Sequence, residues 1–205
     1  CEKKTFSPPL DISPELEKKF TDFMEKTKFI NKTMKIFQGK LEFKFPLMDM
    51  TLDPETANVE LYLLEDHKGV WWRSSKQDLP SNPKRFKFHP CVLGSRGFTS
   101  GWHCWEVEIH GEGMWAVGVA KESIPRETPF ALKPDVGIWA LCHSKDGYKA
   151  LTSPDVTNLT FHDVPQRLRV CLDYQEGRVV FMDATNKGLI FTFPRASFQG
   201  EMIYP

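Results

Sequence analysis

The chain has 205 residues, 40% of them hydrophobic, which is enough for one large domain with its own core. Lys+Arg and Asp+Glu both total 27, so the chain has no net positive charge of the kind that attracts proteins to nucleic acids or anionic membranes. No apolar run approaches the roughly 20 residues that span a bilayer, and no signal-peptide pattern opens the chain. The composition therefore predicts a soluble protein whose partners are chosen by local patches.

The two ends and the cysteines indicate a fragment of an intracellular protein. The chain begins at Cys1 rather than Met and stops just after the apolar residues Met202-Ile203-Tyr204, so we interpret it as part of a longer protein. Its five cysteines are widely spaced and form no CxxC pair of the kind used by zinc and redox sites. This pattern favours reduced thiols in a cytoplasmic protein over a disulfide framework. Cys104 and Cys171 lie in apolar, strand-like runs and are expected in the core.

The first segment has the periodicity of an amphipathic helix or a coiled coil. Its seam residues alternate at spacings of four and three: Leu16, Phe20, Phe23, Thr27, Ile30, Met34 and Phe37. Ser13 before Pro14 is a favourable start signal and Gly39 a favourable stop, so we predict one helix over about 14–38. The apolar side chains of this seam must be buried, either against the domain that follows or against a second copy of the helix in a homodimer.

The polar face of this helix is rich in lysine, as on surfaces that bind nucleic acids or membranes. Acidic residues are interleaved with the lysines at Glu15, Glu17, Asp22 and Glu25. We therefore predict a solvated face with neither a nucleic-acid nor a membrane partner.

From about Thr51 onward the period changes to two. Short runs rich in Val, Ile, Phe and Trp are predicted as strands at 59–64, 104–109, 115–120, 137–142, 168–173, 178–183 and 189–193. Many short strands without intervening helices predict an all-β fold, an antiparallel sandwich or barrel. The turn chemistry agrees, because Asp146-Gly147 and Glu176-Gly177 separate such runs. Residues 77–83, with two prolines, are predicted as a surface loop.

Motifs of catalysis are missing from the sequence. It holds no GxSxG, no HExxH and no glycine-rich phosphate loop, so we predict no enzyme and no catalytic residue. His103 and Cys104 are adjacent, so on a strand they point to opposite faces and cannot share a metal ion. A Cys–His pair involving Cys142 stays open, because such partners meet in space rather than in sequence.

The tryptophans separate into two groups. Trp105 and Trp115 lie within strand-like runs, where core packing is the best explanation. Trp71, Trp72 and Trp102 lie beside loops, where exposed aromatic residues often anchor a partner. For Trp72, core packing and partner contact are equally favoured.

Several consecutive motifs resemble the PRY-SPRY family. The sequence L52-DPETAN-58 followed by L61-YLLED-66 is similar to the opening PRY motif, and D78-LPSNPKRF-86 and C91-VLGSRGFTSGWHCWEVE-108 continue the match. W115-AVGVA-120, Y148-KALTSP-154 and L172-DYQEGRV-179 are similar to the remaining signatures, in the usual order. The resemblance covers about residues 50–205. It implies a twisted concanavalin-like jelly-roll sandwich of two antiparallel sheets, preceded by a helical linker over residues 1–49.

Two groups of proteins carry such a domain, the tripartite-motif ubiquitin ligases and the butyrophilins. The linker-like segment before the sandwich favours the ligase, in which the helix would follow a coiled coil. The resemblance then implies that this fragment recognises a target protein and carries no cofactor. Zinc is expected only in the RING and B-box outside the fragment, so the parent rather than the fragment would be the ubiquitin ligase.

By analogy the recognition loops lie together at one end of the sandwich, at about 71–85, 123–136, 142–148 and 183–188. Their candidate partner-binding residues are Trp72, Arg73, Arg126, Phe130, Lys133, His143, Lys145 and Tyr148, with Phe193 lining the pocket between the sheets. Some relatives carry tryptophans near the positions of Cys142 and Ser144. This chain lacks them, which argues against an antibody-type ligand.

The butyrophilin analogy leaves an alternative open. Lys84, Arg85 and Lys87, or Arg126 with Lys133, would then form a basic pocket for a small anionic ligand such as a phosphate compound. Lysines near loops usually only solvate the surface, so the protein-recognition interpretation is preferred.

Overall fold

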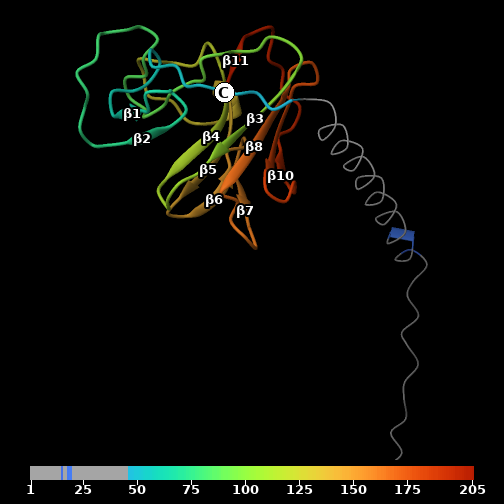
Figure 1. Ribbon diagram of the computed structural model, residues 1–205. Coiled ribbons are helices and arrows are strands. Elements are labelled where there is room, and N and C mark those ends of the chain that lie inside the picture. Colours follow the sequence, from blue (N-terminus) through green and yellow to red (C-terminus); the bar gives the residue numbers. More distant parts are fainter. Residues whose placement is uncertain (1–14, 16–17, 20–45) are drawn as a thin grey trace, which may run out of the picture. The chain divides into compact units, whose positions relative to one another are not determined.

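The computed structural model describes residues 15, 18–19 and 46–205 (Figure 1). The contacts divide the chain into two units, Cys1–Phe45 and Pro46–Pro205. The first unit holds the predicted helix, most of which lies outside the described residues. Only Glu15, Lys18 and Lys19 are described there, and all three are helical. The account that follows concerns the second unit.

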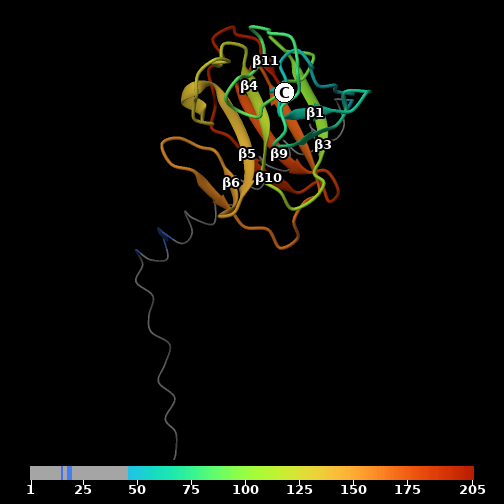
Figure 2. The ribbon, with the colours of Figure 1, turned by 90° about the vertical axis from the view of Figure 1, so that its left-hand side faces the viewer.

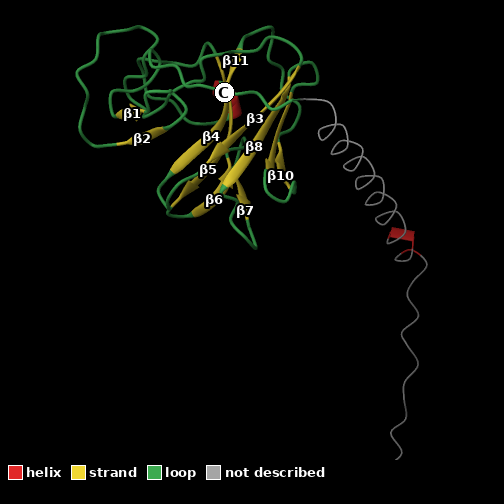
Figure 3. Cartoon of the chain, in the orientation of Figure 1, coloured by secondary structure: helices red, strands yellow, loops and turns green. Residues whose placement is uncertain are grey.

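Within residues 46–205 the chain is almost entirely strand and loop (Figure 3). A two-stranded sheet consists of β1 (Leu61–Leu63) and β2 (Val70–Trp72). A four-stranded sheet has the order β10-β9-β8-β3, with β3 (Trp102–Glu108), β8 (Arg167–Asp173), β9 (Arg178–Asp183) and β10 (Leu189–Thr192). A five-stranded sheet has the order β11-β4-β5-β6-β7, with β4 (Trp115–Lys121), β5 (Ile138–Ser144), β6 (Gly147–Ala150), β7 (Thr157–Leu159) and β11 (Ile203–Tyr204). One 3-10 turn, Pro134–Val136, precedes β5.

All strand pairings are antiparallel, so the predicted all-β antiparallel sandwich is confirmed for the described region. Each of the seven predicted runs contains a strand. The sequence reasoning did not identify β2, β6 and β7, which have only three or four residues each. The two predicted turns are also present, and Gly147 and Gly177 have φ of 95° and 63°, which glycine adopts without strain.

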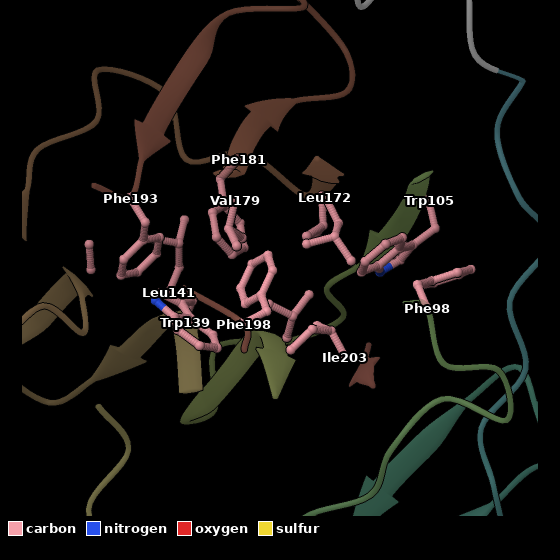
Figure 4. Close-up of a cluster of buried hydrophobic side chains, with 13 residues drawn as sticks. Phe98, Trp105, Trp139, Leu141, Leu172, Val179, Phe181, Phe193, Phe198 and Ile203 are labelled. Carbon is pink, nitrogen blue, oxygen red and sulfur yellow. The ribbon is translucent and has the colours of Figure 1, made fainter. Parts of the chain in front are cut away.

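The core lies between the four-stranded and five-stranded sheets, which face one another in Figure 2. Alternate residues of each strand enter it because successive side chains point to opposite faces. Trp105, Leu172, Val179 and Phe181 come from one sheet and Trp139 and Leu141 from the other, as Figure 4 shows. Trp105 is 2% exposed, as predicted. Trp115 is half-buried and packs against the edge of the same cluster.

The segment before β3 packs on the outer face of the five-stranded sheet. Phe86 and Leu93 form a second buried cluster with Ala120, Ile138 and Ala140. Buried polar side chains fix the loops of this segment. Asn58 donates from Nδ2 to the Phe86 carbonyl at 2.9 Å, and the Thr56 hydroxyl accepts the Leu93 N–H at 3.0 Å. The residues of the opening PRY-like motif thus hold the loop framework together.

The prediction of five reduced thiols is wrong in one respect. Cys104 and Cys171 are both buried in the core as predicted, yet they are joined by a disulfide. They lie directly opposite each other on β3 and β8, with Cα atoms 4.2 Å apart. The strand register that brings two cysteines into one cross-strand pair is not visible in their spacing of 67 residues. Cys91 and Cys142 are free thiols.

Candidate functional site

An aromatic cluster lies where β5 turns into β6. The His143 ring stacks on Tyr148 with centroids 4.3 Å apart, and Phe161 meets Tyr148 edge-on at 5.2 Å. Trp115 contacts both, at 6.3 Å from His143 and 6.2 Å from Tyr148. The His143 Nδ1 lies 3.0 Å from the Gly113 carbonyl, which fixes the ring. We call these four residues the aromatic cluster.

Strand register explains why these side chains meet. Trp115, His143, Tyr148 and Leu159 are successive partners across β4, β5, β6 and β7. His143 is two residues beyond Leu141, so it lies on the same face of β5 as the core. The cluster therefore continues the core row to the end of the sheet, where its members are half-buried rather than enclosed.

The surroundings of the aromatic cluster are suited to protein contact. Lys145 is exposed in the turn between β5 and β6. Met114, next to Trp115, is 80% exposed, and Val164 in the loop after Phe161 is also exposed. Aromatic and methionine side chains are enriched at the centres of protein interfaces, and polar or charged side chains form their rims.

Trp72 and Arg73 lie at a different place, at the end of the β1–β2 hairpin. Trp72 is 57% exposed, so it lies on the surface and not in the core. Its indole donates to Glu60 at 3.1 Å. The guanidinium of Arg73 lies over two rings, 5.0 Å from the centre of Tyr62 and 5.6 Å from that of Trp71.

Arg126 and Phe130 belong to the loop between β4 and β5 and are half-buried. Arg126 lies over Phe86 at 4.3 Å and donates to the Glu122 carbonyl at 3.2 Å. Burial lowers the pKa of its guanidinium. The Phe130 N–H donates to His89 Nε2 at 2.9 Å, and its ring contacts Phe86 and His89. Both residues anchor the loop to the segment before β3.

Lys133 and Phe193 lie near a cavity of about 520 Å³. Lys133 pairs with Asp135 at 3.2 Å, and this contact, with Ser153, holds the pKa of Asp135 below its usual value. Phe193 lines the cavity together with Trp139, but it is only 2% exposed and serves mainly as a core residue. Its accessible surface is too small for a contact with a partner.

The expectation that the four loops lie at one end of the sandwich is wrong. Loop 123–136 leads into the start of β5 and the turn at 145–146 follows its end, so the two lie at opposite ends of this strand. Loop 183–188 lies on the side of the aromatic cluster, since Asp183 is opposite Leu168, which packs beside Cys142 and Tyr148. Loop 71–85 continues into residues that contact Arg126 and Phe130 near the start of β5.

The structure brings His143, Lys145 and Tyr148 together, and separately Trp72 with Arg73. It does not join Arg126 and Lys133 in one basic pocket. In the described part of the chain, Lys84, Lys87 and Lys133 each pair with a carboxylate, of Glu55, Glu127 and Asp135.

Sequence reasoning missed Tyr62 and Phe161. Tyr62 follows the buried Leu61 and could have been assigned to the outer face by strand alternation. Phe161 lies in a loop, and no local pattern indicates its contact with Tyr148.

Within the described ranges no group of three His, Cys, Asp or Glu side chains is arranged to hold a metal ion. Nor does any helix there have the length and apolarity to cross a membrane. Cys142 is half-buried and its pKa is raised by burial, which disfavours the thiolate that a nucleophile requires.

The described residues thus form a two-sheet sandwich whose loops expose aromatic and cationic side chains. The chain belongs to the PRY-SPRY family: the family model "SPRY-associated domain" matches residues 50–98, and the model "SPRY domain" matches residues 102–205. The family resemblance of the sequence motifs is thereby confirmed, and a domain of this type is consistent with a protein-interaction module.

Curated relatives come from both expected groups. The pig E3 ubiquitin-protein ligase TRIM15 is 41% identical over 98% of this chain and 44% of its own length. The human zinc finger protein RFP is 37% identical over 94% of this chain and 40% of its own length. Mouse butyrophilin subfamily 1 member A1 is 44% identical over 76% of this chain and 29% of its own length. The chain thus spans less than half the length of these relatives. The alignments with TRIM15 and RFP extend over nearly all of this chain, which supports a PRY-SPRY domain of the tripartite-motif type.

Solved structures agree on the fold. The TRIM65 PSpry domain superposes with a TM-score of 0.65 at 22% identity, covering 77% of this chain and 83% of that chain. Stonustoxin superposes with a TM-score of 0.65 at 26% identity, covering 77% of this chain and 25% of that chain.

Proposed function

We propose that this chain is the substrate-recognition module of a cytoplasmic tripartite-motif E3 ubiquitin ligase. The observation that carries the proposal is the reach of the tripartite-motif alignments, which include the segment before the sandwich, whereas the butyrophilin alignment covers 155 residues. In this scheme ubiquitin transfer belongs to other parts of the parent, and the sandwich selects what is modified.

The aromatic cluster is the surface on which we propose the target binds. Its rings are held by stacking and by the contact of His143 with Gly113, so little side-chain entropy is lost on binding. Half-buried aromatic residues with a cation, Lys145, at the rim have the composition of an interface centre. The exposed Met114 extends the apolar area.

Proximity labelling from the 205-residue chain tests this proposal when wild type is compared with a His143→Ala, Tyr148→Ala double variant. We expect a set of proteins labelled by wild type and lost with the variant, and we expect the same proteins to lose ubiquitin when the parent gene is deleted. The matched control, Phe88→Ala, removes an exposed ring elsewhere and should leave labelling unchanged. Labelled proteins whose ubiquitination does not depend on the parent would exclude the ligase role.

We also propose that the predicted helix at 14–38 contributes to a homodimer. The proposal rests on the apolar seam of the sequence, with large residues at Phe20 and Phe23 that need cover. Sedimentation equilibrium of the chain should give a dimer that becomes a monomer in the Phe20→Glu, Phe23→Glu variant. A monomer for both proteins would exclude dimerisation through this seam.

A small anionic ligand is the weaker alternative. Of the five candidate cations, Lys84, Lys87 and Lys133 pair with carboxylates, and Arg85 and Arg126 donate to backbone carbonyl groups. Calorimetric titration with inorganic pyrophosphate should therefore give no saturable heat. Saturable binding that is abolished by Arg126→Gln would instead favour a ligand-sensing domain of the butyrophilin type.

A further inference from the structure

The register of the β1–β2 hairpin shows which backbone groups of β2 bond to β1. Hydrogen-bonded pairs occur at Leu64 with Gly69 and at Glu60 with Arg73, with N···O distances of 2.9 and 3.0 Å. Such pairs alternate along an antiparallel ladder, so Trp71, midway between Gly69 and Arg73, also bonds to β1. The backbone groups of the residues on either side of Trp71 therefore point away from β1.

Those two residues, Val70 and Trp72, form an open strand edge. Their N–H and C=O groups have no hydrogen-bond partner among the described residues. In Figure 1 no other strand runs along the far side of β2. All three residues of β2 are exposed, at 40% for Val70 and Trp71 and 57% for Trp72. An edge in this state is a template on which another strand can pair.

The other sheet edges of the described chain are covered, irregular or polar. Gln77 occupies the edge of β1, since its backbone and side-chain N–H groups donate to the Val59 and Leu61 carbonyl groups. Met48 donates to an edge carbonyl of β3, and Phe98 exchanges two hydrogen bonds with β11. β10 has a register shift, which is a usual form of edge protection, and the exposed residues of β7 are a threonine and an asparagine.

β2 has none of these protections. The strand Val70-Trp71-Trp72 contains no charged residue and no proline, and its pairing with β1 is regular. Its apolar side chains point to both faces, because Trp71 shares a face with Tyr62 and the other two residues point to the opposite face. A strand added at this edge would cover apolar surface on both faces. This combination favours a pairing strand of matching length and apolarity.

A second copy of the chain matches this edge, because β2 is complementary to itself. With a two-fold axis at Trp71, Val70 of one copy lies opposite Trp72 of the other, and these are the residues with unpaired backbone groups. Each such pair can exchange two N–H···O bonds. Trp71 then faces Trp71 of the second copy in the closer, non-hydrogen-bonded type of pair, where aromatic side chains stabilise antiparallel strands.

The charge next to β2 is compatible with this arrangement. Arg73 lies over the rings of Tyr62 and Trp71, at 5.0 and 5.6 Å from their centres, and the two-fold places it opposite Gly69, which has no side chain. The two copies of Arg73 are then four residues apart along the paired strands, or roughly 13 Å, a separation at which salt largely screens their repulsion. No like charges are therefore brought face to face.

We propose that β2 pairs with β2 of a second copy of this chain, antiparallel and about a two-fold axis at Trp71. Three residues bury much less than the about 800 Å² per partner of a stable interface, so the pairing is weak and depends on concentration. It involves neither the aromatic cluster nor the helix predicted at 14–38. The pairing is therefore separate from the proposed target site and from dimerisation through that helix.

Sedimentation equilibrium tests the pairing once the helix seam is removed from the measurement. The background is the Phe20→Glu, Phe23→Glu variant, studied between roughly 10 μM and 1 mM. We expect its average mass to rise with concentration, and Trp71→Lys in this background to stay monomeric because like charges would lie opposite each other. Asn158→Lys, at an exposed position of the edge strand β7, is the matched control and should leave the rise unchanged. A constant monomer mass in the background, or an equal rise in Trp71→Lys, would overturn the proposal.

Cysteine cross-linking tests the two-fold register directly. In the same background with Cys1→Ser, oxidation by glutathione disulfide should link two Trp71→Cys chains, whose Cα atoms would lie about 4.5 Å apart. Val70→Cys chains should not link to each other, because their Cα atoms would be roughly 8 Å apart, but a mixture of Val70→Cys and Trp72→Cys should link. Peptide mass spectrometry identifies the linked positions. Equal yields for Trp71→Cys and Val70→Cys would overturn the two-fold, since chance collisions do not distinguish neighbouring positions.

Discussion

The thiol of Cys91 lies under the loop between β4 and β5, close to Arg126. Burial raises its pKa to about 11, although the positive charge of Arg126 acts in the opposite direction. Since the thiolate is the reactive form, only roughly one Cys91 in a thousand is ionised at pH 8 in the folded protein, against about a quarter at the ordinary value.

We therefore predict that iodoacetamide at pH 8 alkylates Cys91 at least about a hundredfold more slowly in the folded chain than in urea. Peptide mass spectrometry on a Cys1→Ser variant measures this rate without interference from the first residue. Equal rates in the two states would mean that the thiol is accessible and ionised.

Asn58 illustrates a buried polar side chain that supports the fold. Its Nδ2 satisfies the Phe86 carbonyl and its Oδ1 accepts the Glu60 N–H, at 2.9 Å each. Asn58→Ala should lower the free energy of unfolding by about 1–3 kcal/mol, because both backbone groups lose their partner. Urea denaturation measures the change. Asn158→Ala, at an exposed edge-strand position, should change stability by less than about 0.5 kcal/mol.

For single residues, the sequence indicated which side chains are candidates for the core or for a partner contact. It indicated less well where in the fold those side chains lie. Trp105 was predictable as a core residue because it lies in a long strand, where Glu106 and Glu108 alternate with Trp105 and Val107. The sequence could not decide whether Trp72 is buried or exposed, because β2 has only three residues and shows no alternation. In the structure all three residues of β2 are exposed. His143 and Tyr148 were correctly placed together because they flank one tight turn.

At the scale of elements, the turn between β8 and β9 requires a residue without a Cβ. Gly177 has φ of 63°, and a Cβ there would lie 1.9 Å from the Ala196 carbonyl oxygen. Gly177→Ala should therefore cost clearly more than the ~1 kcal/mol of a left-handed alanine. Gly111→Ala is the matched control, since Gly111 has φ of 85° and open space around it. Thermal unfolding of the two variants separates steric contact from backbone strain, and equal losses would contradict the predicted contact.

The link between β4 and the last strand depends on an ion pair. Lys121 lies 2.9 Å from Glu201, and hydrogen bonds from Ser123 and Lys121 lower the pKa of Glu201. Because the folded pKa is lower than the unfolded one, this carboxylate stabilises the fold above its unfolded pKa of about 4.3, and the contribution is lost as pH falls through the folded pKa.

We predict that Glu201→Gln reduces the loss of stability between about pH 5 and pH 3 relative to wild type. Urea unfolding at a series of pH values measures the slope. Glu112→Gln, at an exposed position in the β3–β4 loop, is the control and should leave the slope unchanged. Parallel slopes for wild type and Glu201→Gln would show that the pair does not contribute.

Runs rich in β-branched, aromatic and other apolar residues were predictable as strands. Some of them alternate with polar residues, as in 104–109, whereas residues 138–142 and 179–182 are continuously apolar and largely buried. β7 lacks both patterns in Thr157-Asn158-Leu159, and its strand character comes from pairing with β6. The order of elements along the sequence could have shown that the four loops do not all lie at one end of the sandwich. Connections before and after one strand must lie at its opposite ends, so loops 123–136 and 142–148 could not share an end.

For the molecule as a whole, the disulfide is the property that the sequence concealed. Among the four described cysteines, the Cys104–Cys171 disulfide leaves two free thiols, Cys91 and Cys142. Denaturing a Cys1→Ser variant without reductant in N-ethylmaleimide should therefore add two labels, and four after reduction, as counted by intact mass. Four labels without reductant would restore the original prediction of reduced thiols.

The position of the aromatic cluster at one end of β5, with loop 123–136 at the other, has a consequence for avidity. A strand of seven residues spans roughly 23 Å, so the two ends of β5 are separated by about this distance. A target that contacted both ends through two linked motifs would make its second contact intramolecularly, and two weak affinities would combine into a strong one. Selectivity would then depend on the spacing of two motifs within the target, as well as on each motif alone.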